Sequence, residues 1–248
     1  MTDATPPRPV IILLEPQLAE NIGMTARAMG NFGLDALRIV NPKGGWPMKG
    51  VRETASNATH VLDGATIFPT VAEALADLHY VLATTARERG QMKRVFGPDE
   101  GMAEAAERLA AGERVGVLFG RERVGLSNDE VSLADAIVTF PVDPQHASLN
   151  LAQSVLLVGY EWRRAAGQAA LPFAGAMRSG PAPREALISL FESLEADLDA
   201  AGYYPPAKRD GMIRNMRDMF HRMAMTEQDV RTFRGALRAL ARRSVDED

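Results

Sequence analysis

Short apolar runs alternate with stretches of helical periodicity over the first part of the chain. The run Val10–Leu14 is typical of a buried strand, and residues 21–31 after it have a helical pattern. Further apolar runs predict strands at 37–40, 66–68, 80–83, 115–119 and 136–140. Helical segments separate most of these strands, at 71–78, 101–111 and 127–133. The alternation predicts an α/β fold in which a mostly parallel sheet carries helices on both faces.

A more apolar helix is predicted from Ser148 onward. Its apolar stripe and the residues that widen it are Leu149, Leu151, Val155, Leu156, Leu157, Val158 and Trp162. A helix that is apolar over so much of its surface is buried, either in the core of the chain or against a partner subunit.

The composition changes after this helix. Residues 166–183 are rich in Ala, Gly and Pro and are predicted to form a linker. Two or three helices follow, over 184–201, 209–223 and 227–243. The pattern therefore predicts an α/β domain over residues 1–165, a linker over 166–183 and a helical extension over 184–248.

The chain contains no cysteine, which excludes thiolate metal sites and redox dithiols. It also excludes methylation of a pyrimidine ring at carbon 5 by a covalent cysteine nucleophile. The four histidines are scattered without the short spacings of a zinc site, so no metal is expected. No apolar run approaches the roughly 18 residues of a membrane span, and the first residues lack the apolar core of a signal peptide. We therefore expect a cytoplasmic protein that does not bind a membrane.

Basic residues are concentrated near the end of the chain, although the net charge is −4. Between Lys208 and Arg243 ten basic residues face four acidic ones, which gives this segment a charge of +6. Most of the basic residues are arginines, and the planar guanidinium can bind two phosphate oxygens at once. The pattern is compatible with phosphate binding and equally with a solvated helix face.

A first polar motif, Asn21-x-Gly23-x-x-x-Arg27, lies where the first strand gives way to a helix. Open parallel sheets place ligands at this edge, outside the carboxyl ends of the strands. We expect Asn21 to act as the helix N-cap and Gly23 to allow a close approach by backbone or ligand. Arg27 can be read as an ordinary solvent-facing residue.

A second motif, Phe119-Gly120-x-Glu122-x-x-Gly125-Leu126, joins a strongly apolar strand to a helix. Leu126 stands where a phosphate-binding loop requires lysine, which disfavours nucleotide hydrolysis. The chain also lacks the Gly-x-Gly-x-x-Gly fingerprint of a nucleotide-dependent oxidoreductase. The remaining alternatives are a tight loop that offers backbone amides to another ligand and a plain strand-to-helix turn.

A third motif runs from Phe140 to Ala152 and leads into the apolar helix. Its two prolines are expected to hold the approach extended, and Ser148 is expected to cap the helix. Asn150 is interpreted as a buried amide that ties down backbone or meets a ligand. His146 is interpreted as structural or peripheral.

In their order and spacing, the three motifs resemble those of the SPOUT methyltransferases, in particular the TrmH-like class that methylates ribose 2′-hydroxyls of RNA. The resemblance implies a homodimer, with a C-terminal trefoil knot in which S-adenosylmethionine is bound. The implied cofactor-binding residues are Thr84, Thr85, Ala86, Gly120, Phe140, Ala147, Ser148 and Leu149. The implied catalytic residues are Arg27, Asn21, Glu122, Ser148 and Asn150.

The helical tail resembles the extension of the TrmJ family, the tRNA (cytidine/uridine-32)-2′-O-methyltransferases. The resemblance rests on Gly202-Tyr203, Met212-x-x-x-Met216-Arg217-x-Met219-Phe220-x-Arg222 and Leu237-x-x-Leu240. It implies methylation of nucleotide 32 in the anticodon loop and a tail that docks on tRNA. The implied RNA-binding residues are Arg27, Arg209, Arg214, Arg217 and Arg222. The alternatives are the same chemistry on ribosomal RNA or another tRNA position, and an inactive knotted RNA-binding protein.

Overall fold

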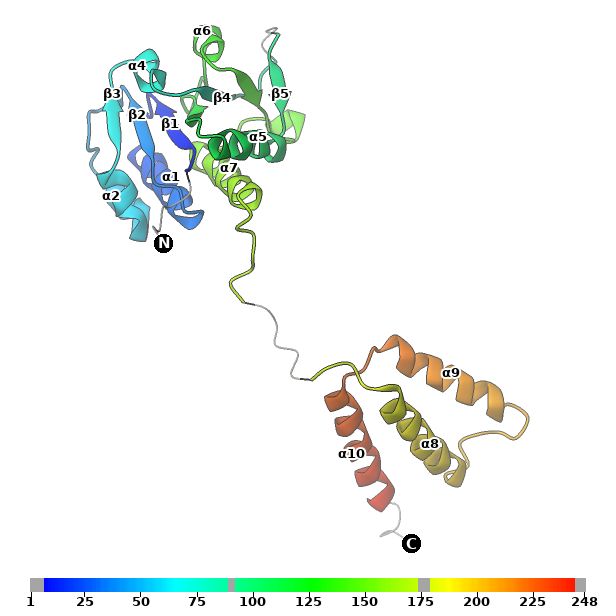
Figure 1. Ribbon diagram of the computed structural model, residues 1–248. Helices are drawn as coiled ribbons and strands as arrows, with labels where there is room; N and C mark the ends of the chain where they lie inside the picture. Colours follow the sequence, from blue (N-terminus) through cyan, green and yellow to red (C-terminus); the bar gives the residue numbers. More distant parts are fainter. Residues whose placement is uncertain (1–6, 89–91, 174–178, 244–248) are drawn as a thin grey trace. The chain divides into compact units, whose positions relative to one another are not determined.

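The computed structural model describes residues 7–88, 92–173 and 179–243, with side chains described up to residue 240 (Figure 1). The chain divides into two compact units, Met1–Ala170 and Leu171–Asp248. Among the described residues, unit 1 contains two clusters of buried apolar residues and unit 2 contains a third, and each unit is described by itself.

Unit 1 is built on a parallel sheet. Over the described residues this sheet has seven strands in the order β3-β2-β1-β6-β4-β7-β5. The strands are β1 (Val10–Leu14), β2 (Leu37–Val40), β3 (Thr66–Phe68), β4 (Tyr80–Thr84), β5 (Arg94–Phe96), β6 (Val115–Phe119) and β7 (Ala136–Val138). Every neighbouring pair in this order is parallel. The predicted α/β fold with a parallel sheet is confirmed.

The helices of unit 1 cover both faces of this sheet because side chains alternate along each strand. Ile11 and Leu13 of β1 face one core, whereas Ile12 and Leu14 face the other. The helices on the first face are α1 (Ala19–Asn31), α2 (Val51–Ala55), α3 (Thr59–Asp63), α5 (Pro98–Ala110) and α7 (Leu151–Ala165). Those on the second face are α4 (Val71–Leu75) and α6 (Asn128–Ser132).

The apolar pattern missed several short elements. In β5 only Phe96 is buried, so this edge strand has no continuous apolar run to reveal it. The helices α2 and α3 span five residues each, too few for a helical period to be recognised. The approach to α7 is not extended throughout, because Pro144–His146 forms a 3-10 turn (η2) that the Asp143 side chain caps.

Unit 2 consists of α8 (Arg184–Ala200), α9 (Arg209–Arg222) and α10 (Glu227–Arg243). Its core is centred on Phe220, whose ring lies 5.8 Å from that of Phe191 and 5.2 Å from that of Phe233. In the part of the chain that the structure describes, no helix is long and apolar enough to cross a membrane.

Gly23 lets α1 and α2 approach closely. A Cβ added at Gly23 would lie 2.0 Å from Thr54 Oγ1 and 2.3 Å from the Val51 carbonyl oxygen. The close approach expected at this glycine therefore exists, and the neighbour is another helix of the same chain.

We predict that Gly23→Ala lowers the free energy of unfolding of unit 1 by about 1–3 kcal/mol, because the added carbon overpacks the contact between the two helices. Gly64→Ala is the matched control, since its added carbon would have its nearest neighbour at 3.4 Å. Denaturant unfolding followed by tryptophan fluorescence reports on unit 1, which contains both tryptophans, Trp46 and Trp162. Equal stability of the two variants would contradict the close packing of α1 on α2.

Candidate active site

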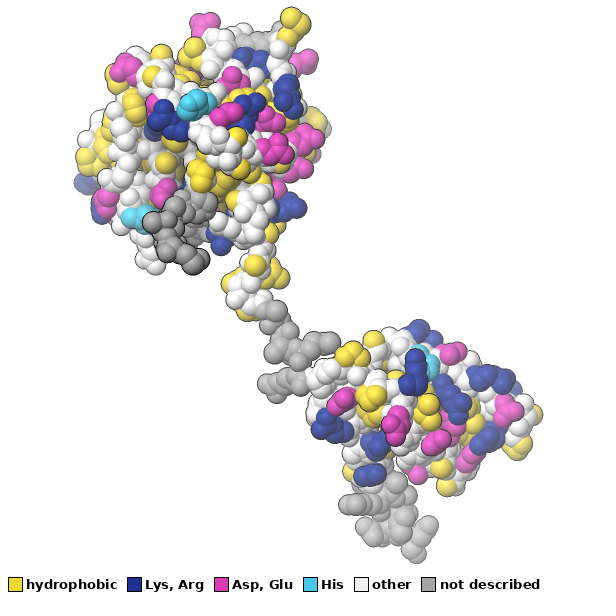
Figure 2. All heavy atoms as spheres, in the orientation of Figure 1, with side chains coloured by type: hydrophobic (Ala, Val, Ile, Leu, Met, Phe, Trp, Pro, Cys, Tyr) yellow, Lys and Arg dark blue, Asp and Glu magenta, His cyan; other side chains and the backbone are white. Residues whose placement is uncertain are grey.

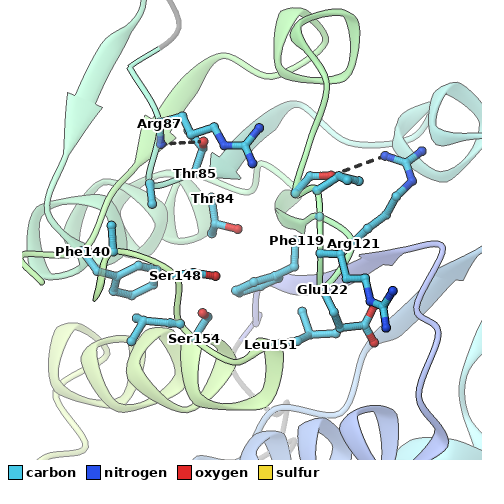
Figure 3. Close-up of a pocket in the computed structure, with 17 residues that line it drawn as sticks. Thr84, Thr85, Arg87, Phe119, Arg121, Glu122, Phe140, Ser148, Leu151 and Ser154 are labelled. Atoms are coloured by element: carbon cyan, nitrogen blue, oxygen red, sulfur yellow. Dashed lines mark hydrogen bonds between the residues drawn. The ribbon is translucent and has the colours of Figure 1, made fainter. Parts of the chain in front are cut away.

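A cavity lies at the edge of the sheet where β4, β6 and β7 end (Figure 3). The residues that line it are Thr84, Thr85, Ala86, Arg87, Phe119, Gly120, Arg121, Glu122, Arg123, Val124, Gly125, Phe140, Ala147, Ser148, Leu149, Leu151 and Ser154. The structure brings together all eight residues implied to bind the cofactor. This edge is the usual place for a ligand in an open parallel sheet.

Two hydroxyls of the cavity wall are engaged within the protein. Thr84 Oγ1 donates a hydrogen bond to the Leu118 carbonyl at 3.0 Å, and Thr85 Oγ1 accepts one from the Arg87 backbone N–H at 3.1 Å. The threonines therefore fix the wall itself, while Phe140 and Leu149 provide apolar surface.

The wall after β6 is a tight turn that requires its glycines. A Cβ at Gly120 would lie 2.4 Å from the Gly125 carbonyl carbon and 2.5 Å from the Leu126 nitrogen. Gly125 itself has a φ of +67°, in the left-handed region that favours glycine. The second motif is thus a compact backbone wall of the cavity rather than a phosphate loop.

Glu122 caps the start of α1 from outside the helix. Its carboxylate accepts hydrogen bonds from the backbone N–H groups of Gln17, at 3.1 Å, and Leu18, at 3.3 Å. The N-cap residue Leu18 offers no capping side chain of its own. A negative charge at a helix N-terminus is favourable because the first N–H groups have no partner within the helix.

The expected capping role of Asn21 is wrong, because α1 begins at Ala19 and Asn21 lies inside the first turn. Asn21 is 4% exposed, and its Nδ2 donates to Glu122 at 3.3 Å. Its Oδ1 accepts from Asn150 Nδ2 at 2.9 Å. The three motifs are therefore joined by one hydrogen-bond chain, Glu122–Asn21–Asn150.

Asn150, and not Ser148, caps the apolar helix α7. Its Oδ1 accepts from the backbone N–H groups of Ala152, at 2.9 Å, and Gln153, at 3.3 Å. Asn150 is exposed rather than buried, whereas its partner Asn21 is the buried amide. The Asn150 side chain therefore holds backbone N–H groups, which was one of the two interpretations of this residue. Ser148 lines the cavity.

The predicted catalytic residues are not all in one place within a single chain. Arg27 is exposed on α1 and lines a separate depression with Gly30, Asn31, Ser56, Asn57, Ala58 and His60. His146 is exposed. Among the described residues no group of three or more His, Cys, Asp or Glu side chains is placed to hold a metal ion.

Arg121 carries an ion-pair network that the sequence motifs did not reveal. Its hydrogen bonds lower the pKa of Glu15 below the usual range. Burial alone would raise the pKa of Glu130, but hydrogen bonds from Arg121 and from the Ser127 N–H outweigh it and lower that pKa. The two carboxylates in turn raise the pKa of Arg121. All three groups are therefore charged at neutral pH.

The cations of the tail are partly neutralised within unit 2. Arg217 forms a two-pronged pair with Glu195 of α8 at 2.6 and 2.7 Å, and Arg209 pairs with Asp199 of the same helix. Residues 171–248 contain 12 basic and 12 acidic residues, so the excess over 208–243 is balanced outside that segment. Figure 2 shows cationic and acidic side chains interspersed on the visible face of unit 2.

Arg214 and Arg222 differ from these two arginines. Both are exposed, and within residues 179–240 neither forms an ion pair. Among the arginines predicted to bind RNA through the tail, these two are available to an external anion.

Comparison with known proteins shows which family combines these features. The SpoU rRNA Methylase family matches residues 8–160, and the C-terminal domain of the tRNA methyltransferase TrmJ matches residues 185–248. The chain belongs to the SpoU methylase family. It is an RNA methyltransferase of the TrmJ type, as the resemblance of its motifs predicted.

Relatives of this SpoU-family chain match it over nearly its whole length. A Pseudomonas aeruginosa protein named tRNA (cytidine/uridine/adenosine-2′-O-)-methyltransferase TrmJ is 32% identical, over 92% of this chain and 91% of its own. A Klebsiella pneumoniae protein named tRNA (cytidine/uridine-2′-O-)-methyltransferase TrmJ is 34% identical, over 93% and 95%. The crystal structure of TrmJ from Z. mobilis is 44% identical and superposes with a TM-score of 0.82, covering 94% of this chain and 99% of that one.

We predict that Asn150→Ala destabilises the SpoU-family domain by about 1 kcal/mol, since α7 loses its N-cap. Asn150→Asp should retain most of this stability, because a carboxylate still accepts from the first helical N–H groups. Denaturant unfolding of the two variants checks both values. If Asn150→Asp were as destabilising as Asn150→Ala, capping would not be the main contribution of Asn150.

Proposed function

We propose that this SpoU-family chain transfers a methyl group from S-adenosylmethionine to a ribose 2′-hydroxyl of tRNA. The observation that carries the proposal is the cavity lined by the second and third motif segments, which hydrogen bonds from Glu122 and Asn150 join to Asn21 of the first motif. The names of the P. aeruginosa and K. pneumoniae relatives and the match of residues 185–248 to the TrmJ C-terminal domain support tRNA as the substrate.

The residues of the cavity fit S-adenosylmethionine. The backbone wall at Gly120 approaches so closely that any side chain there would collide with Gly125, and Phe140 and Leu149 offer apolar surface for an adenine ring. The remaining residues proposed to hold the cofactor are Thr84, Thr85, Ala86, Ala147 and Ser148. When bound, the cofactor supplies a methyl group already activated on a sulfonium. The protein then has to align the ribose hydroxyl and assist its deprotonation.

Arg27 is proposed to act on the substrate by charge. An arginine is a poor general base because its guanidinium stays protonated at neutral pH. We propose instead that Arg27 holds a phosphate of the target RNA and favours ionisation of the 2′-hydroxyl, while Ser148 or that phosphate takes the proton. Asn21, Glu122 and Asn150 position the segments that carry these groups, through the bonds that join them.

A homodimer is proposed because Arg27 does not line the cavity of its own chain. In a single chain α7 exposes three large apolar side chains, with Leu156 39%, Leu157 40% and Tyr160 48% exposed. A contiguous apolar helix face in water favours association. We propose that a second copy covers this face and brings its Arg27 to the cavity, and that the segment leading into α7 is tucked into a trefoil knot.

The proposed roles of the parts of the chain follow the change in composition along the sequence. We propose a catalytic domain over residues 1–165, a linker over 166–183 and a tRNA-docking extension over 184–248. The target is proposed to be nucleotide 32, C or U, of the anticodon loop, and the enzyme is proposed to act in the cytoplasm. Within the extension, Arg214 and Arg222 are the proposed phosphate contacts, because Arg209 and Arg217 already pair with acids.

Mass spectrometry of methylated tRNA tests the function. The purified protein is incubated with S-adenosylmethionine that carries a deuterated methyl group and with total tRNA, and the digested RNA is analysed. We expect the label on the ribose of nucleotide 32 and no label on a transcript with a 2′-deoxyribose there. Label on a base, or on the ribose of another tRNA nucleotide with nucleotide 32 unlabelled, would contradict the proposal. Cofactor binding without any transfer would indicate an inactive RNA-binding protein.

We predict that Arg27→Ala abolishes methylation while leaving the dissociation constant for S-adenosylmethionine nearly unchanged, since Arg27 does not line the cavity of its own chain and the partner's Arg27 is proposed to contact the RNA and not the cofactor. Arg114→Ala is the control, an exposed arginine just before β6 at the opposite edge of the sheet. Turnover assays and calorimetric titration measure the two quantities. Methylation by Arg27→Ala at a near wild-type rate would eliminate this residue from the mechanism.

We predict that the Arg214→Ala/Arg222→Ala double variant binds tRNA more weakly and lowers the slope of log affinity against log salt by up to about 2, one for each lost phosphate contact. Arg209→Ala/Arg217→Ala removes the same charge but breaks contacts with α8, so its main effect should be a lower melting temperature of unit 2. Filter binding at several salt concentrations distinguishes them. Equal loss of affinity in both variants would show that total charge, and not its availability, governs docking.

A further inference from the structure

The Arg121 side chain joins the cavity wall to two other parts of unit 1. Its Nε donates to Glu15, at the end of β1, at 3.0 Å. Its terminal nitrogens donate to the two carboxylate oxygens of Glu130, in α6, at 2.9 and 3.1 Å. Figure 3 shows the side chain turned away from the cavity, with a hydrogen bond to the Gly125 carbonyl. Arg121 therefore does not present its charge to a ligand and instead ties the wall to its surroundings.

The turn that Arg121 opens is closed by Gly125. The Arg121 N–H donates to the Gly125 carbonyl at 3.3 Å, and the Gly125 N–H donates back to Arg121 at 2.9 Å. Beyond the turn, Glu130 also accepts from the Ser127 N–H at 2.6 Å, in the capping box of α6. The Arg121 guanidinium thus contacts both Gly125, which closes the turn, and Glu130 in the helix that follows it.

Glu15 is held in an unusual conformation at the other end of this network. Its φ is +41°, which is strained for a residue other than glycine. Lys43 and Asn41, which follow β2, contact its carboxylate at 3.6 and 3.4 Å. The network therefore runs across the carboxyl ends of β2, β1 and β6.

Arg121 and Glu122 both bind the short segment 15–18 that joins β1 to α1. Arg121 binds the carboxylate of Glu15, while Glu122 binds the backbone N–H groups of Gln17 and Leu18. Because these are adjacent residues of one turn, a displacement of Arg121 also displaces the Glu122 carboxylate from the start of α1.

We propose that Arg121 is a positioning residue for methyl transfer, which fixes the turn 120–125 as the cofactor-binding wall and aligns Glu122 with the first motif. The proposal rests on the proposed function of this cavity. Lysine cannot replace it, because a single ammonium lacks the planar fork that reaches Glu15 and Glu130 at the same time.

The substitutions that test this role are Arg121→Lys and Arg121→Gln. Arg121→Gln leaves two partly buried carboxylates facing each other, with Glu15 20% and Glu130 17% exposed, and is expected to reduce stability. Arg121→Lys keeps the charge, and is therefore the variant in which folding and positioning can be separated.

Arg38→Lys is the matched control. Arg38 is 15% exposed, against 17% for Arg121, and it also makes a two-pronged bond to a carboxylate, that of Asp77. Arg38 also contacts the Ala74 carbonyl and the Phe68 ring, and both residues lie outside the cavity lining.

For Arg121→Lys we expect a dissociation constant for S-adenosylmethionine raised about tenfold and a lower kcat at saturating cofactor, since small misplacements of an aligned site are costly. The melting temperature should fall no more than in Arg38→Lys, and tRNA affinity should not change. Calorimetry, turnover assays and filter binding measure these quantities on the full chain.

Equal effects of the two lysine variants on melting temperature, cofactor affinity and kcat would overturn the proposal and leave Arg121 a purely structural ion pair. This failure differs from a failure of the proposed function, in which the wild-type chain itself would not bind S-adenosylmethionine.

Discussion

The Glu122 carboxylate at the start of α1 is the interaction on which the site depends. It accepts hydrogen bonds from the backbone N–H groups of Gln17 and Leu18, where Leu18 has no capping side chain, and from the buried amide of Asn21. Asn21 in turn accepts a hydrogen bond from Asn150, the N-cap of α7. Two helices of the first sheet face therefore begin at positions set by one turn after β6, and the cavity lies beside that turn. Each of the three sequence motifs supplies one partner of this hydrogen-bond chain.

This arrangement separates the residues that build the frame of the cavity from those that we propose act on the substrate. Hydrogen bonds within the protein occupy the side chains of Asn21, Asn150 and Glu122. Ser148, in contrast, lines the cavity. Arg27, two turns along α1 from Asn21, faces solvent. In the proposed dimer, a second copy brings its Arg27 to the frame that the first chain builds around the cavity.

All strands except β5 were predictable, because most of the buried runs are nearly continuous in apolar residues, as in Val10–Leu14 and Val115–Phe119. The residues that cap the helices were not predictable, because capping depends on which backbone N–H groups lie within reach of a side chain. Asn21, for example, is a residue type that often caps helices, but it lies inside α1. Periodicity cannot reveal that Glu122, a hundred residues away, caps α1. The residues of the cavity wall were identified from the resemblance of the motifs. Arg121 was not identified, because its partners Glu15 and Glu130 come together only in the fold. Charge counting likewise missed that α8 neutralises Arg209 and Arg217.

The most direct measurement is amide hydrogen exchange of the wild-type and Glu122→Ala chains, with and without S-adenosylmethionine. If Glu122 assembles the site, its loss should speed exchange at the start of α1 and, through Asn21, at the start of α7. Cofactor should then protect the turn 120–125 in the wild type and much less in the variant. Faster exchange confined to α1, with cofactor protection unchanged, would contradict the account, because α7 and the cavity wall would then be positioned independently of Glu122.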